Sequence, residues 1–179
     1  MPTDPSPSNY GDLAFTPAVK AVQEKMGSRD HQARLEGRAH RIHLTTEEHD
    51  FIARRDSFYL ATAGETGWPY IQHRGGPPGF LRKLGPQELG LADFKGNRQY
   101  ISTGNIEATG KAHLFLMDYV AQERLKLWVH ATVSYDPDLI AQLTPNDYQT
   151  RVERAFLFEV LAFDWNCKLH ISPRHSAGE

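Results

Sequence analysis

The sequence is poor in the features that mark secreted, membrane-bound or nucleic-acid-coating proteins. Cys167 is its single cysteine, which excludes an internal disulfide. No apolar run resembles a signal peptide or a membrane span, so we expect a cytoplasmic protein without a membrane partner. Lys and Arg number 20 against 22 Asp and Glu, a formal charge of -2. This balance argues against a protein that coats nucleic acid.

The familiar catalytic motifs are also missing. The chain has no G-x-S-x-G elbow, no Walker loop, no G-x-G-x-x-G after a strand, no C-x-x-C pair and no H-E-x-x-H. Three of its histidines, His40, His43 and His49, are close in sequence, but no carboxylate stands at a spacing typical of a metal site. We therefore expect solvated surface histidines and no metal.

The 179 residues are enough for one domain with one good core. Residues 1–15 are rich in Pro, Ser, Asp and Gly, which predicts a flexible arm ahead of a single domain at 16–179. Thr16 and Pro17 predict the start of a helix that Gly27 ends, with Val19, Val22 and Met26 on one packing face.

A second short helix is predicted to begin at Thr45. Glu48 lies three residues on and would complete a capping box, while Phe51 and Ile52 would supply buried contacts. We expect both helices to serve as packing elements.

From Ser57 the pattern changes to strands. "SFYLATA" and "WPYIQH" flank a turn with two glycines, and "GFLRKL" and "ELGLAD" flank Gly85–Pro86, so two hairpins are predicted. "KAHLFLMDYV", "RLKLWVHATV" and "RAFLFEVLAFDW" follow as further strands. Six or seven strands with short turns and peripheral helices favour a mainly β (α+β) antiparallel split β-barrel.

The strand "KAHLFLMDYV" is apolar on both faces. Leu114 and Leu116 alternate with Phe115 and Met117, whereas one barrel core covers only one face. The second face predicts a homodimer interface, because obligate interfaces resemble a domain core cut in half. The alternative is that the chain's own helices cover it.

Two segments combine basic side chains with glycine and proline. "QHRGGPPGF" offers an arginine fork on bare, rigid backbone, and "KGNRQYIS" places a lysine, an asparagine and an arginine before a predicted helix start. Between Gln72 and Arg98 five basic side chains stand against two acidic ones. The segments could converge on one phosphate; the alternative is a pair of ordinary turns with solvated arginines.

Three separated stretches resemble the pyridoxamine 5'-phosphate oxidase-like superfamily of flavin-binding split barrels, in its bacterial oxidase-related branch. They are "FYLATAGETGWPYIQHRGGPPGFL", "LADFKGNRQYISTGNI" and "FDWNCKLHISPR", and the resemblance runs from Ser57 through Arg174. It implies a homodimer with two FMN molecules held between the subunits.

The resemblance also implies a set of cofactor-binding residues, with His170 where the oxidase contacts its substrate. The residues expected at FMN are Gln72, His73, Arg74, Gly75, Lys95, Asn97, Arg98, Gln99, Ser102, Trp165 and Arg174, of which Trp165 and Arg174 would reach the flavin of the partner chain.

The pattern departs from the oxidase itself at Gln72, where that enzyme carries an arginine, and in "GGPPGF" and "NCKLHISPR". A substrate other than pyridoxamine phosphate is therefore expected, with a reduced nicotinamide as a candidate electron donor. His73 or Arg74 would stabilise reduced flavin. Trp165 would stack near the ring or serve as a core aromatic.

Two classes of function remain open. One is an FMN-dependent oxidoreductase acting on a small organic molecule, in which His170 could orient substrate or move a proton. The other is a non-catalytic flavin store or redox sensor. Haem or a deazaflavin is a third candidate occupant. Cys167 is interpreted as a small buried hydrophobe.

Overall fold

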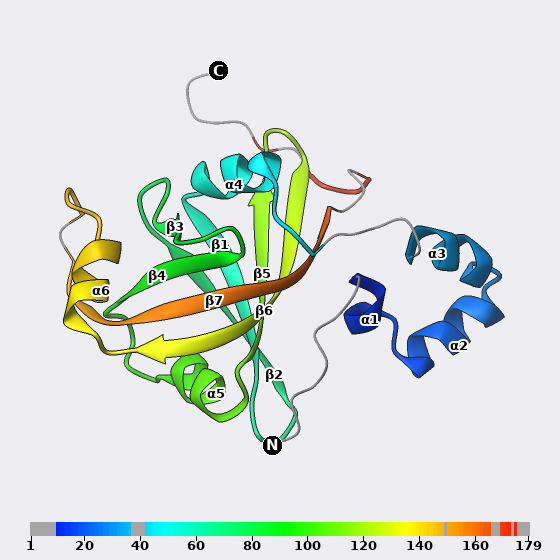
Figure 1. Ribbon diagram of the computed structural model, residues 1–179, viewed down its shortest axis with the longest axis horizontal. Helices are drawn as coiled ribbons and strands as arrows, with labels where there is room; N and C mark the ends of the chain where they lie inside the picture. Colours follow the sequence, from blue (N-terminus) through cyan, green and yellow to red (C-terminus); the bar gives the residue numbers. More distant parts are fainter. Residues whose placement is uncertain (1–9, 37–41, 149, 166–168, 173, 175–179) are drawn as a thin grey trace.

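The computed structural model describes residues 10–36, 42–148, 150–165, 169–172 and 174. Seven antiparallel strands form one curled sheet, with short helices at its periphery (Figure 1). The predicted fold class is confirmed. The helices are α1 (Tyr10–Ala14), α2 (Pro17–Lys25), α3 (Arg29–Glu36), α4 (Thr46–Ala53), α5 (Ile101–Thr109) and α6 (Pro137–Leu143). The strands are β1 (Ser57–Ala63), β2 (Pro69–Gly75), β3 (Leu81–Lys83), β4 (Glu88–Phe94), β5 (Lys111–Asp118), β6 (Glu123–Ser134) and β7 (Val152–Trp165).

The strand order across the sheet is β2-β1-β5-β6-β7-β4-β3. Both predicted hairpins, β1–β2 and β3–β4, are present and antiparallel. β5, β6 and β7 pair in sequence order, and β7 then pairs with β4. The sheet therefore has two free edges, at β2 and at β3, which is the split of the barrel.

A single main core fills the curled sheet. Phe58, Leu60, Leu114 and Phe156 are among its fully buried side chains. α4 lies across one end, where Phe51 and Ile52 join the core (Figure 1). The predicted capping box is confirmed, because Thr45 caps α4 and the Glu48 carboxylate accepts from the Thr45 backbone N–H at 2.8 Å.

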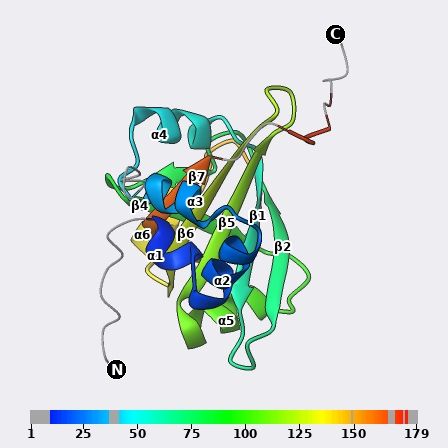
Figure 2. The same cartoon turned by 90° about the vertical axis from the view of Figure 1, so that its right-hand side faces the viewer.

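The first predicted helix is confirmed in position but not in packing. Thr16 caps α2 and Pro17 is its first residue, and Gly27 follows with φ +71°. No residue of α2 is buried, however, and Val22 and Met26 are 59% and 74% exposed. The expectation that this face packs is wrong within the chain, because α2 and α3 lie off the side of the sheet (Figures 1 and 2).

α1 packs on the outer face of the sheet at Trp128 of β6, the strand next to β5. Leu114 and Leu116 point into the core, while Phe115 and Met117 lie half-buried on the other side. Next to them His113 packs edge-on against Trp128 of β6, with ring centroids 4.6 Å apart. Tyr10 of α1 packs against the same indole, with centroids 5.0 Å apart. The chain's own helix thus supplies some of the cover that was expected from a second subunit.

His113 is the most perturbed histidine in the described part of the chain. Burial, with a smaller contribution from the Lys126 ammonium, lowers the pKa of His113 to about 4. Its imidazole is therefore neutral at physiological pH.

Residues 1–9 of the predicted arm, and Cys167, lie outside the described residues; Tyr10–Ala14 form α1. Among the described residues, none of the helices is both long enough and apolar enough to cross a membrane.

Candidate functional site

The site begins on β2, whose alternation sends Gln72 and Arg74 to the inner face of the sheet. They stand opposite Leu60 and Phe58 of β1, two fully buried core residues. The Arg74 guanidinium lies over the Phe156 ring at 5.3 Å and donates from Nη2 to the Gln72 side-chain oxygen at 3.3 Å. The arginine of "QHRGG" is thus a half-buried side chain that faces inward.

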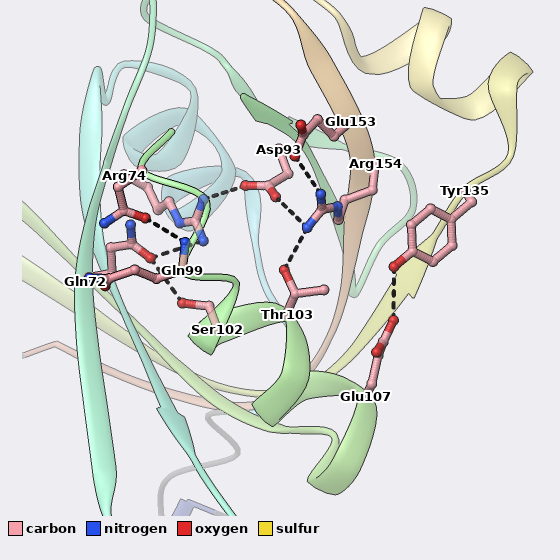
Figure 3. Close-up of polar contacts among 11 residues, drawn as sticks. Gln72, Arg74, Asp93, Gln99, Ser102, Thr103, Glu107, Tyr135, Glu153 and Arg154 are labelled. Carbon is pink, nitrogen blue, oxygen red and sulfur yellow. Dashed lines mark hydrogen bonds and ion pairs between the residues drawn. The ribbon is translucent and has the colours of Figure 1, made fainter. Parts of the chain in front are cut away.

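Arg74 forms an ion pair with Asp93 of β4 (Figure 3). β3 pairs with β4 only as far as Leu91, so Asp93 lies where β4 itself is the free edge. Since β2 is the other edge strand, the pair joins the two sides of the split. The carboxylate is buried, with its side chain 8% exposed.

Arg154 of β7 lies on the other side of Asp93, its Nη1 at 3.6 Å from the carboxylate. The same Nη1 donates to the Thr103 hydroxyl at 3.0 Å, and Nη2 donates to Glu153 at 2.6 Å. Its guanidinium also lies 4.7 Å from the centre of the Tyr100 ring. Arg154 therefore ties β7 to the first turn of α5.

Burial raises the pKa of the Asp93 carboxyl, and the Arg74 and Arg154 guanidiniums offset only part of this effect. Two arginine atoms in the cluster, Nε of Arg74 and Nε of Arg154, are buried without a hydrogen-bond partner. The cluster is therefore charge-balanced yet retains unused donors.

α5 brings a second set of polar groups to Gln72. The Ser102 hydroxyl donates to the Gln72 oxygen at 3.2 Å (Figure 3). Gln99 is exposed and lies two residues before the helix. Tyr100 precedes the helix with φ +55° and gives it no side-chain cap. α5 is held on β1 by Asn105, which donates to Thr62 at 3.0 Å. The start of α5 is thus fixed beside Gln72 with its first amide groups uncapped by a side chain.

The β4–α5 loop carries the exposed basic groups that were predicted. Lys95, Asn97 and Arg98 all lie on the surface, and Arg98 has φ +64°. The Asn97 side-chain oxygen accepts from the Gln99 backbone N–H at 3.1 Å, which shapes the loop. Within the described ranges neither Lys95 nor Arg98 forms an ion pair. These cations remain available to an anion.

His73 and Gly75 lie on the outer face of β2, away from Gln72 and Arg74. The His73 ring packs edge-on against Tyr59, with centroids 5.6 Å apart. A Cβ on Gly75 would stand 3.2 Å from the His73 ring. The predicted residues of β2 therefore lie on two faces, Gln72 and Arg74 on the inner one and His73 and Gly75 on the outer one. A ligand could meet all of them only at the backbone along the free edge of the strand.

Trp165, His170 and Arg174 are separated from this cluster. Arg154 stands near the start of the 14-residue β7, and Trp165 is its last residue. The Trp165 indole N–H donates to the Glu48 carboxylate at 2.7 Å, and its ring packs on Phe51. Arg174 lies over the Tyr119 ring at 4.1 Å, and His170 is exposed with φ +64°. One chain alone does not bring them to Gln72.

Three residues of the cluster, Asp93, Thr103 and Arg154, were not predicted from the sequence. Asp93 continues the row of Leu89 and Leu91, and Arg154 begins the row of Phe156 and Phe158. The available signal was a charged residue at a strand position that faces the core. Charged side chains normally take such positions only when they are paired, so both residues could have been predicted to form buried ion pairs.

The donor set fits a phosphorylated ligand. Lys95 and Arg98 supply positive charge, Asn97 supplies a neutral polar side chain, and the uncapped start of α5 favours an anion. Ser102 is buried, and its hydroxyl already donates to Gln72. The unpartnered Nε of Arg74 stands in the neighbouring cluster. Arg74 itself fits less directly, since Asp93 already holds its guanidinium.

No protein-family model and no curated protein matches the sequence. Solved structures match it by fold. HupZ of Group A Streptococcus is 15% identical, with 74% of this chain and 99% of that chain covered and a TM-score of 0.56.

Two further structures resemble the chain at similar levels. A Clostridium acetobutylicum protein related to general stress protein 26 of B. subtilis, of the pyridoxinephosphate oxidase family, is 15% identical, with 70% and 88% covered and a TM-score of 0.53. An FMN-binding protein from Syntrophomonas wolfei is 12% identical, with 65% and 81% covered and a TM-score of 0.51. At these identities the likeness is one of fold, and the predicted split barrel is confirmed.

Proposed function

We propose that this chain, which has the fold of pyridoxamine 5'-phosphate oxidase-like proteins, binds FMN between two copies of itself and acts as a flavin-dependent oxidoreductase on a small organic molecule. The observation that carries the proposal is the meeting of β2 and α5, where Gln72 accepts hydrogen bonds from both Arg74 and Ser102 beside an exposed basic loop. An FMN-binding protein of the same fold supports the cofactor.

The phosphate of FMN would be held by Lys95 and Arg98, with Asn97, Gln99 and Ser102 as polar partners. Two cations without ion pairs in the described ranges can approach a phosphate without first losing a carboxylate. The free edge of β2, from Gln72 to Gly75, would offer backbone groups to the flat ring. Bound FMN would supply hydride transfer, which none of the chain's side chains performs.

The placement of the remaining residues supports a homodimer. Trp165 is the last residue of β7, at the opposite end from the Asp93 cluster, and His170 and Arg174 follow it, so a second copy would bring these residues to the cofactor. In that arrangement Trp165 would wall the ring from water, Arg174 would add a positive charge, and His170 would orient the substrate or hold a proton.

The second candidate is a flavin-binding protein without catalytic activity. The Arg74–Asp93 pair favours it, because a guanidinium neutralised by a carboxylate contributes little positive charge to a reduced flavin. A flavin store or redox sensor needs to bind flavin but does not need a site for a substrate.

The proposal is tested by binding and sedimentation experiments on the purified full chain. FMN titration followed by flavin fluorescence, together with sedimentation velocity, should give saturable binding and a dimer of about twice the 20.3 kDa chain mass. A clean monomer, or no binding of FMN, contradicts the proposal. Absorption spectroscopy of the copurified molecule separates FMN from haem or a deazaflavin. NADH-dependent turnover of an acceptor supports the oxidoreductase, and tight binding without turnover supports the second candidate.

A further inference from the structure

A cavity of about 450 Å³ lies on the outer face of the sheet, on the side that α6 covers (Figure 1). Its volume falls within the range of small-molecule sites. The cavity faces away from the Asp93 cluster, because Glu159 and Leu157 point to the other side of β7 from Arg154 and Phe156. The core residues Leu89 and Phe158 also border it. It is lined on one side by half-buried Leu84, Leu139 and Leu157 and on the other by polar side chains.

The polar side of the cavity is a row across three adjacent strands. Glu88 of β4 stands opposite Glu159 of β7, and Glu159 stands opposite His130 of β6. Neighbouring strands are about 4.8 Å apart, so the three side chains leave the same face side by side. All three are exposed, with the His130 ring over Gly110 on the β5 side and the Glu88 carboxylate beside Gly85.

The two glutamates form an unfavourable pair in isolation. Like charges directly opposite each other on neighbouring strands destabilise a sheet. In the part of the chain that the structure describes, neither Glu88 nor Glu159 forms an ion pair. Lys111, the register partner of His130, and Arg82 of β3 do not line the cavity. The lining therefore combines two carboxylates with an apolar wall and includes no Lys or Arg among the described residues.

We propose that this cavity binds a small organic cation with an apolar body, such as an alkylamine or an arylalkylamine. Its ammonium group would donate hydrogen bonds to Glu88 and Glu159, with the His130 ring as a further polar neighbour. The hydrocarbon part would lie against Leu84, Leu139 and Leu157, which bury apolar area that water now reaches.

A metal ion fits the same residues less well. Metal ligands must converge on one point at about 2–2.6 Å, and among the described residues no three His, Cys, Asp or Glu side chains are so arranged. A metal also leaves the leucine wall without a role. An amine with a hydrocarbon body fits better, because its ammonium group can contact the carboxylates while its hydrocarbon part contacts the leucines.

The experiment is calorimetric titration of the full chain with n-hexylammonium chloride at neutral pH and low salt. We expect saturable binding that weakens about 3- to 10-fold in a Glu88→Gln, Glu159→Gln double variant, since partly exposed charge pairs are modest individually. Glu65→Gln, in the exposed β1–β2 turn, is the matched control and should leave the affinity unchanged.

Four results would overturn the proposal. The first is equal affinity for hexan-1-ol, which has the same hydrocarbon without charge. The second is full affinity in the double variant. The third is amide shift changes, on titration with hexylammonium, that fall outside residues 84–89, 130–132 and 157–159. Because the variant removes a like-charge pair, its melting temperature should stay the same or rise; a clear fall would assign the glutamates to the fold and not to a ligand.

Discussion

Arg74 and Asp93 join the two sides of an open sheet. Arg74 comes from β2 at one edge, and Asp93 comes from the stretch of β4 that β3 does not reach. No backbone pairing links these strands, so a buried ion pair acts where a closed barrel would have a ladder of hydrogen bonds. The pair therefore sets how far the barrel opens beside the proposed cofactor site.

Asp93→Asn should lower the free energy of unfolding by about 3 kcal/mol, because it leaves the buried Arg74 and Arg154 guanidiniums without their shared carboxylate. Urea denaturation measures the change. Asp50→Asn, an exposed carboxylate on α4, should stay within about 0.5 kcal/mol of the parent protein. A loss below about 1 kcal/mol for Asp93→Asn would show that the pair does not hold the edges together.

His113 should make the protein sensitive to mild acid. The unfolded chain takes up a proton near pH 6.5, whereas folded His113 resists it to about pH 4. The contribution of His113 to the free energy of unfolding is therefore fully present above pH 6.5. It falls as the pH drops, by up to about 3 kcal/mol at pH 4.

The comparison of urea midpoints at pH 7 and pH 4.5 tests the role of His113. His113→Phe keeps a ring against Trp128 and removes this part of the acid sensitivity. His43→Gln, at an exposed position, should retain it. Equal pH dependence in the parent protein and in His113→Phe would contradict the assignment.

Trp165→Phe should cost about 1–2 kcal/mol of stability even without a cofactor, because the Glu48 carboxylate loses a hydrogen bond while still buried. Burial raises the pKa of Glu48, and hydrogen bonds from Thr45 and Trp165 more than offset this, so the carboxyl is ionised. Trp68→Phe, 79% exposed, is the control. A change in flavin fluorescence in Trp165→Phe would show in addition that the indole reaches the ring of the partner's cofactor.

Arg98→Ala should weaken FMN binding by about 1.5–3 kcal/mol, the value of a charge-assisted hydrogen bond to phosphate. Fluorescence titration measures the dissociation constant. Lys111→Ala removes an exposed cation from β5 and should have no effect. An unchanged constant in Arg98→Ala would remove this residue from the site.

The sequence predicted the sheet well because its signals are local. Hairpin turns, the alternation of β6 and the caps at Thr16 and Thr45 each depend on a few neighbouring residues, and the structure contains all of them. The prediction that α2 packs against the domain was wrong because packing depends on distant parts of the chain and not on local signals. A helical stripe of Val22 and Met26 shows that a face is apolar, but not which surface covers it.

The candidate site was predicted only in part. The pairing of Gln72 with Ser102 follows from two segments that both carry recognisable signals. The partner of Arg74 does not, because Asp93 is distant in sequence and is brought near only by the curl of the sheet. The sequence predicted which residues would bind an anion, and the structure shows that one of them, Arg74, already pairs with a carboxylate.

β7 pairs on both sides, with β6 along one flank and with β4 along the other. β4 precedes β7 by about sixty residues, so the edge of β4 that faces β7 has its full partner only once the chain reaches Glu159, the last β7 residue that pairs with β4. Until then Leu89 and Leu91 of β4 have only the short strand β3 beside them. Closure of this side of the barrel therefore depends on pairing between residues about sixty to seventy positions apart and comes late in folding.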